Sequence, residues 1–338
     1  MNKAWFFGLI FSLIALNSHG QNWLAFFGRT DTNYIKEFER PYMLQLSAWY
    51  NRFTFYVDPS IVNDNPNSLK LAPNLRPQIG VLLGLKYISL SLSVATPFSV
   101  NNDRVYGNTK FFDFNIGYFR GFFGGEFYYT DNHGMYQNSR NGSNRVRTNA
   151  GLYAIGANGF YAFNHHKFSF RSSIKNQELQ CKSAGSPVLM LSIGRKEVDA
   201  DTALVQGSFK NPQYVSNFDN LFGLRITHFS VRPGYAYNFS IKGGRYFVSP
   251  ALFVGAGYSR LTLFKGSEYV SINSFNYDLH SKLVCGYNHP KYYWNLYALY
   301  DVTLNRITTQ TYTSFNNFFV GINVGFRFRH FLKKVDWL

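Results

Sequence analysis

Charged residues and cysteines are scarce in this sequence. Asp, Glu, Lys and Arg make up 15% of the 338 residues, against roughly 25% in an ordinary soluble domain. The two cysteines, Cys181 and Cys285, are too few for a disulfide framework. They could pair with each other in an oxidising compartment or remain two buried free thiols. A small disulfide-stabilised domain is therefore excluded.

Motifs of the common enzyme classes are also missing. The chain contains no GxSxG nucleophile elbow, no HExxH and no P-loop. Its eight histidines show no metal-ligand spacing, and the adjacent pair His165 and His166 would point to opposite faces of a strand. Glycines at 121–125 and 255–257 precede no predicted helix, which favours close packing over phosphate binding. We expect no metal, no cofactor and no enzymatic activity.

Long apolar runs are absent after the first 20 residues, so no helical membrane domain is predicted. Residues 1–20 themselves are typical of a secretory signal peptide. A basic residue precedes the apolar run 5–16, and small residues stand at the −3 and −1 positions of a cleavage site between Gly20 and Gln21. The alternative, an N-terminal anchor, is disfavoured because the run is short for a spanning helix.

Aromatic residues and positive charge are abundant. Phe, Trp and Tyr form 19% of the chain, with 25 Tyr and 35 Phe, and the net charge is +16. A basic balance suggests nucleic acid, phosphorylated glycolipid or anionic solutes as partners. No arginine-rich run or basic helix is present, so we expect no nucleic-acid binding.

The clearest pattern lies in residues 229–258. Apolar residues occupy every second position of 229–241, and the alternation resumes over 246–258 after a Lys-Gly-Gly turn at 242–244. A period of two is the side-chain period of a β-strand, and glycines supply the positive φ angles of a tight turn. Tyr246 and Tyr258 bracket the apolar face of the second strand. Twelve residues tilted by about 40° rise roughly 30 Å, close to the thickness of a membrane core.

This hairpin predicts an all-β, antiparallel transmembrane β-barrel, with a soluble aromatic-rich sandwich as the alternative. Strands are expected at 42–57, 78–96 and 111–130 (two each), 148–163, 167–173, 188–195, 229–241, 246–258, 271–287, 292–304 and 317–331, with a short one at 203–209. Short turns at 86–87, 120–121, 164–166, 242–244 and 288–290 alternate with long loops near 58–77, 97–110, 131–147, 262–271 and 305–316.

Alternation of short periplasmic turns with longer extracellular loops is typical of outer-membrane barrels. The clear strands number 13, and bacterial single-chain barrels have even counts. Either a strand in 198–223 is missing, giving 14, or one in 167–197 is counted in error, giving 12. We favour about 12 strands within a range of 10–14. The expected organisation is a signal peptide at 1–20, a periplasmic N-terminal extension at 21–41 and the barrel at 42–338.

Several local motifs resemble a known family. They are Asp31-Thr32-Asn33-Tyr34-Ile35, the segment Phe163 to Arg171 (FNHHKFSFR), Gln180 to Ser186 (QCKSAGS) and Pro233-Gly234-Tyr235-Ala236-Tyr237. Together they resemble domain of unknown function 4421, found in outer-membrane proteins of Bacteroidetes-type bacteria. The resemblance covers most of the chain after the signal and implies an outer-membrane barrel. It implies no activity, ligand or catalytic residue, because the family is uncharacterised.

Strand parity yields the best candidate site. If the apolar faces point to lipid, six charged side chains point into the barrel: Arg232, Arg327, Arg329, Asp113, Glu126 and Asp301. Charges of both signs in a narrow lumen favour pairing into a structural plug, since an unpaired charge there is costly. The alternative is a small pore or ligand pocket biased toward anions by its arginines. Residues 182–186 could then fold inward as a constriction.

We therefore predict a non-enzymatic outer-membrane barrel of a Gram-negative cell, exported with a cleaved signal peptide, and either a narrow porin-like channel or a structural barrel. An envelope or surface interaction barrel acting through long polar loops is the alternative. A lipid-modifying barrel enzyme is disfavoured, because His228 and His330 lie near strand ends without an identifiable serine. The expected partners are outer-membrane lipid and lipopolysaccharide, or a small anionic solute; no oligomeric state is assigned.

Overall fold

Long antiparallel strands form most of the chain. The computed structural model describes residues 30–58, 69–74, 76–98, 101–138, 144–204, 220–307 and 312–330. The predicted signal peptide with its Gly20–Gln21 cleavage point, and most of the predicted strand at 203–209, lie outside these residues. No helix in the described part is long and apolar enough to cross a membrane.

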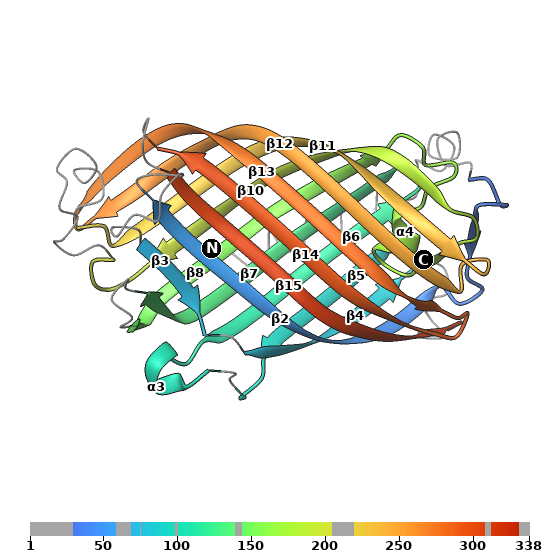
Figure 1. Cartoon of the computed structure of the whole chain (residues 1–338), viewed down its shortest axis with the longest axis horizontal. Coiled ribbons are helices and arrows are strands. Elements are labelled where there is room, and N and C mark those ends of the chain that lie inside the picture. Colours follow the sequence, from blue (N-terminus) through green and yellow to red (C-terminus); the bar gives the residue numbers. More distant parts are fainter. Residues whose placement is uncertain are drawn as a thin grey trace.

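The barrel wall contains twelve strands. They are β2 (Tyr42–Asp58), β4 (Pro77–Leu85), β5 (Ile88–Ala95), β6 (Lys110–Arg120), β7 (Phe123–Asn138), β8 (Asn144–Ala162), β10 (Ala184–Asp199), β11 (Gly223–Ile241), β12 (Tyr246–Lys265), β13 (Glu268–Asn288), β14 (Tyr292–Arg306) and β15 (Tyr312–Phe328). Each pairs antiparallel with the next, and β15 pairs with β2 to close the ring (Figure 1). The predicted count of 12 is confirmed.

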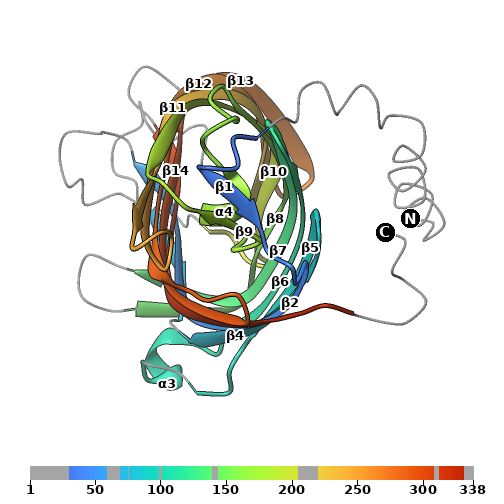
Figure 2. The same cartoon turned by 90° about the vertical axis from the view of Figure 1, so that its right-hand side faces the viewer.

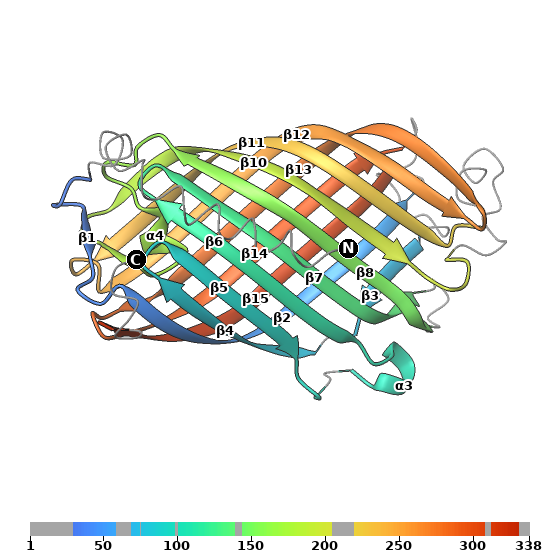
Figure 3. The same ribbon diagram turned by 180° about the vertical axis from the view of Figure 1, so that it is seen from behind.

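The lipid-facing surface follows the predicted parity. In the β11–β12 hairpin, the positions exposed on the outside include Val231, Tyr235, Leu252 and Val254. The residues that alternate with them along each strand face inward. An apolar side chain is stable on the outside of a protein where it meets hydrocarbon, so this exposed band is what a membrane-spanning barrel requires. The strands are inclined across the barrel in Figures 1 and 3, as closure of a sheet into a barrel demands.

Small elements inside one end of the barrel were not predicted. They are β1 (Ile35–Glu37), α4 (Phe170–Ser173) and β9 (Glu178–Gln180), and β1 pairs antiparallel with β9. Figure 2 looks into this end and shows all three within the ring of wall strands. We call residues 30–39 and 163–183 the plug. The predicted strand at 167–173 is therefore wrong, because its short alternation reflects packing inside the lumen and it has no wall partner.

Several predicted loops are instead extensions of strands. β12 and β13 continue to Lys265 and Glu268 and meet at a two-residue turn with Gly266 at φ 59°, so a long loop at 262–271 is wrong. β7 and β8 extend as a hairpin through most of 131–147. Strands that leave the membrane have no need for an apolar face, so their sequence resembles a loop.

The predicted loop at 58–77 contains one further strand, β3 (Leu69–Pro73), which pairs with both β2 and β7. It lies beyond the ends of the short strands β4, β5 and β6. The sheet between β2 and β7 therefore narrows from three strands to one toward the long-loop end. The short helix α3 (Asp103–Tyr106) lies outside the wall beside this narrowing (Figure 3).

Candidate functional site

A network of charged side chains crosses the middle of the barrel. The Arg232 guanidinium on β11 lies 3.1 Å from a carboxylate oxygen of Asp278 on β13 and 3.3 Å from one of Asp301 on β14. His280 Nδ1 lies 2.8 Å from Asp301 Oδ2. We call these four residues the central cluster. Of the six charges predicted to face inward, it contains two, Arg232 and Asp301.

The other two predicted acids lie inside the barrel but make separate contacts. The Glu126 carboxylate lies 3.0 Å from Lys175 Nζ, and Lys175 belongs to the plug. Asp113 accepts a 2.7 Å hydrogen bond from the Thr130 hydroxyl on the neighbouring strand. The interior charges are thus distributed over several partners along the lumen instead of lining one continuous path.

Arg327 holds the plug in place. Its guanidinium donates to the carbonyl oxygen of Asn176, with Nε 3.1 Å away, and to Asn288 Oδ1 at 2.6 Å. The guanidinium carbon also lies 3.8 Å from the centre of the Phe38 ring and 4.6 Å from that of Tyr293. A cation over an aromatic face is attracted by the ring quadrupole. Arg327 therefore connects the last wall strand to both parts of the plug.

Arg329 does not join the interior charges. It lies just past the end of β15, its side chain is exposed, and its guanidinium pairs with Glu39 at 2.7 Å. The prediction that it faces inward is wrong, because strand alternation ceases to fix side-chain direction once the strand has ended.

Apolar layers lie on either side of the central cluster. Toward the short-turn end, Phe168 and Phe170 of the plug pack against a buried cluster that includes Phe119, Phe160 and Phe253 of the wall. Toward the long-loop end, a second buried cluster includes Phe55, Phe315 and two residues of the β10–β11 connection, Leu204 and Leu221. Apolar constrictions are barriers to ions, because an ion cannot keep its hydration shell there.

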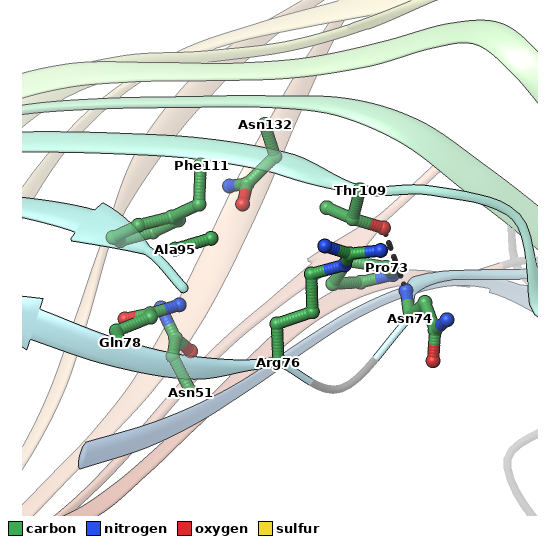
Figure 4. A pocket seen from close by; sticks show the side chains of 9 residues that line it. All are labelled: Asn51, Pro73, Asn74, Arg76, Gln78, Ala95, Thr109, Phe111 and Asn132. Carbon is green, nitrogen blue, oxygen red and sulfur yellow. Dashed lines mark hydrogen bonds between the residues drawn. The ribbon is translucent and has the colours of Figure 1, made fainter. Parts of the chain in front are cut away.

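Two small pockets among the described residues have a volume of about 10 Å³ each, room for about one water molecule. One of them lies beneath the narrowing of the wall and is shown in Figure 4. Polar side chains line it, including Asn51, Gln78, Asn132 and Arg76, and the Arg76 guanidinium pairs with Asp103 of α3 at 2.6 Å.

The segment around Cys181 closes the edge of the plug. The Cys181 amide donates to the Tyr34 carbonyl, which ties the 163–183 segment to the N-terminal one. Burial raises the pKa of the Cys181 thiol, and the nearby positive charge of Lys36 lowers it by a smaller amount. Both Cys181 and Cys285 are free thiols, so they do not pair with each other, but both are partly exposed where buried thiols were expected. The residues 182–186 that could have formed a constriction instead lead into β10.

The remaining predicted positions are found as follows. Tyr246 and Tyr258 are 43% and 49% exposed at the two ends of the apolar face of β12, where an aromatic belt is expected. His228, considered as a rim residue, is buried and faces the interior, 2% exposed. Among the described residues, no group of three or more His, Cys, Asp and Glu is placed to hold a metal ion.

Sequence reasoning missed two classes of interior residue. Asp278, His280 and Lys282 alternate along β13, and the parity used for the other strands could have identified them. Arg171 and Glu178, which form a buried ion pair inside the plug, could not be identified, because α4 and β9 are too short to show a side-chain period in the sequence.

Comparison with known proteins assigns the chain to a family. A family model described as domain of unknown function (DUF4421) matches residues 29–328. The chain belongs to this family. No curated protein matches the sequence.

Among solved structures, the DUF4421 protein is similar to OmpT, an outer membrane protein of Vibrio cholerae, with 9% identity, 85% of this chain and 98% of that chain covered, and a TM-score of 0.33. It is also similar to the β domain of the Bordetella autotransporter Brka, with 13% identity, 82% of this chain and 98% of that chain covered, and a TM-score of 0.37. The translocator domain of the autotransporter NalP from Neisseria meningitidis is similar with 12% identity, 84% of this chain and 88% of that chain covered, and a TM-score of 0.38. Similarity at this level indicates neither a role nor a substrate.

Proposed function

We propose that this protein is a non-enzymatic outer-membrane barrel whose lumen is closed in this conformation. The observation that carries the proposal is the filled interior: the plug occupies the short-turn end, and apolar clusters lie above and below a layer of paired charges. Because the barrel is antiparallel, closed and exposes an apolar band, its function is exercised in a membrane. We place it in the outer membrane, with short turns in the periplasm and long hairpins outside.

Charge pairing supports a structural role for the interior over an anion-selective pore. Arg232, the most central of the predicted arginines, has two carboxylates within 3.3 Å, so its charge is largely neutralised. Arg327 donates to the plug. An arginine that selected anions would need to present its guanidinium to water in an open path.

Conductance in a planar lipid bilayer tests this proposal. We expect the purified protein to insert without discrete current steps. Phe170→Ala, which removes a buried ring from the plug, should produce fluctuating conductance by loosening the short-turn end. The matched control is Phe163→Ala, because Phe163 is 57% exposed on the same connection. Stable anion-selective steps in the unmodified protein, reduced by Arg232→Ala, would refute the closed barrel and establish the porin-like alternative.

A surface-interaction role is the second candidate, and the β12–β13 hairpin favours it. This hairpin extends seven residues past Tyr258, and Tyr269 near its tip is 71% exposed. Exposed aromatic side chains on a rigid projection are suited to contact another molecule. Shortening the hairpin by matched residue pairs should abolish surface binding while leaving a heat-modifiable barrel; unchanged binding would remove this candidate.

A further inference from the structure

A cluster of arginines lies on the outer wall next to the apolar band. Arg195 on β10, Thr227 on β11 and Arg260 on β12 are direct neighbours in register, with Thr227 in the middle. Arg225 lies two residues from Thr227 along β11. We call these four residues the arginine cradle. β10, β11 and β12 run side by side along one wall of the barrel (Figure 1).

The cradle faces outward, on the same side as the lipid-facing residues. Thr227 and Arg260 are exposed, and the side chains of Arg195 and Arg225 are 41% and 34% exposed. Neighbouring strands are about 4.8 Å apart and two residues along a strand span about 7 Å. Three guanidinium groups and one hydroxyl are therefore gathered around a single point on the surface.

Apolar side chains border the cradle on its membrane side. Ile193, Phe229 and Tyr258 are register neighbours one step closer to the short-turn end, and all three are about half exposed. We call them the apolar shelf. Tyr258 also marks the end of the predicted 30 Å apolar face of β12. Shelf and cradle together form an amphipathic surface at the boundary between hydrocarbon and headgroups.

Glu197 arranges two of the arginines. Its carboxylate accepts from Arg225 Nε and Nη2, both at 3.0 Å, and from Arg195 Nε at 3.1 Å. Arg225 also lies over the Phe264 ring, 4.9 Å from its centre. These contacts hold two guanidinium planes in place, while Arg260 adds a third charge. Three arginines against one glutamate leave two positive charges, which match the roughly −1.5 to −2 of a phosphate monoester at neutral pH.

We propose that the arginine cradle and apolar shelf bind a phosphorylated glycolipid of the outer leaflet, with the phosphate at Thr227 and acyl chains along the shelf. Guanidinium groups bind phosphate oxygens through paired, charge-assisted hydrogen bonds, and the threonine hydroxyl can donate one more. The apolar shelf distinguishes a lipid from a free phosphate, because only the lipid gains contacts there. The leaflet, but not the site chemistry, rests on the outer-membrane location proposed above.

Lipid binding by the full-length mature protein tests the site. The protein in phosphatidylcholine nanodiscs is titrated with bisphosphorylated lipid A or with dephosphorylated lipid A, and bound lipid is counted by native mass spectrometry. We expect Arg260→Gln, which leaves the ion pairs of Glu197 intact, to weaken binding of bisphosphorylated lipid A about threefold to tenfold. The triple variant Arg195→Gln, Arg225→Gln, Arg260→Gln should weaken binding of bisphosphorylated lipid A by about tenfold or more.

Two further variants sharpen the test. Arg245→Gln makes the same charge change on an exposed residue at the opposite, short-turn end and should leave the affinity unchanged. Glu197→Gln removes the competing carboxylate and should tighten binding. Heat-modifiable migration in gels checks that each variant is folded. It also tests the barrel fold independently of lipid binding.

Three results would overturn the proposal. One is equal affinity of Arg260→Gln, the triple variant and the unmodified protein. Another is equal binding of dephosphorylated lipid A. The last is displacement of the lipid by inorganic phosphate at matched phosphate concentration, which would assign the cradle to a free anion. An open conductance in bilayers would refute the closed barrel while leaving the lipid result untouched.

Discussion

Replacing Arg232 by methionine should destabilise the barrel strongly, because Asp278 loses its positive partner and Asp301 keeps only His280. The side chains of Arg232 and Asp278 are 4% and 0% exposed, so neither charge has access to bulk water. At 3.1 Å and an effective dielectric constant of about 20, the Coulomb attraction of this pair is about 5 kcal/mol before desolvation is subtracted. Removing one partner of such a buried pair costs about 3–5 kcal/mol, since it leaves an uncompensated charge.

The cost should be recovered when the charges are removed together. In the triple variant Arg232→Met, Asp278→Asn, Asp301→Asn, no buried carboxylate of the central cluster remains, so we expect a net loss below about 2 kcal/mol. The expected coupling between Arg232 and the two acids is therefore large and non-additive. Urea-induced unfolding of the mature protein from lipid vesicles, followed by the fluorescence of its four tryptophans, measures each free energy of unfolding.

A small effect would refute the reasoning. If Arg232→Met costs less than about 1 kcal/mol and the substitutions add independently, the cluster behaves like a set of solvated surface ion pairs. The middle of the barrel would then be a water-filled path, and the closed-lumen proposal would lose its electrostatic argument.

The remaining predictions concern the wall and the plug. Leu252→Arg, in the middle of the apolar band, should reduce the free energy of unfolding by about 2–4 kcal/mol, against about 0–1 for Tyr258→Arg at its edge; equal costs would contradict the assigned membrane position. Arg327→Gln should speed amide hydrogen exchange at 174–180, while Arg329→Gln, on an exposed ion pair, should not. The raised pKa of Cys181 predicts a smaller thiolate fraction at neutral pH. In a variant with Cys285→Ala, maleimide should therefore label Cys181 more slowly in the folded than in the unfolded protein, and the difference should narrow as pH rises. Equal labelling rates at neutral pH would argue against burial of Cys181.

The wall of the barrel could be predicted from the sequence because its environment is simple. Outward positions such as Leu252 and Tyr235 meet hydrocarbon whatever lies across the barrel, so period two alone assigns their face. The same parity placed Arg232 and Asp301 inside. It could not show that these two residues touch, because their contact joins strands 69 residues apart and depends on the curvature and stagger of the closed sheet.

Elements shaped by neighbours were not predictable. Phe168 and Phe170 alternate like strand residues, yet they belong to the plug, where they pack in a buried apolar cluster inside the lumen. The β12–β13 extension was predicted to be a loop. Outside the membrane a strand can carry polar residues on both faces, so lipid enforces no apolar alternation on its sequence there.

By itself, the sequence determined the barrel, its strand direction and the side of the wall on which most residues lie, because alternation is a local property that lipid enforces residue by residue. Only the tertiary structure decided that the lumen is filled, which inward charges pair, and that Arg195, Arg225 and Arg260 surround one threonine. The first two features depend on contacts between strands distant in the chain. The third depends on the register of β10 against β11, which no short turn sets because the connection between these strands is long.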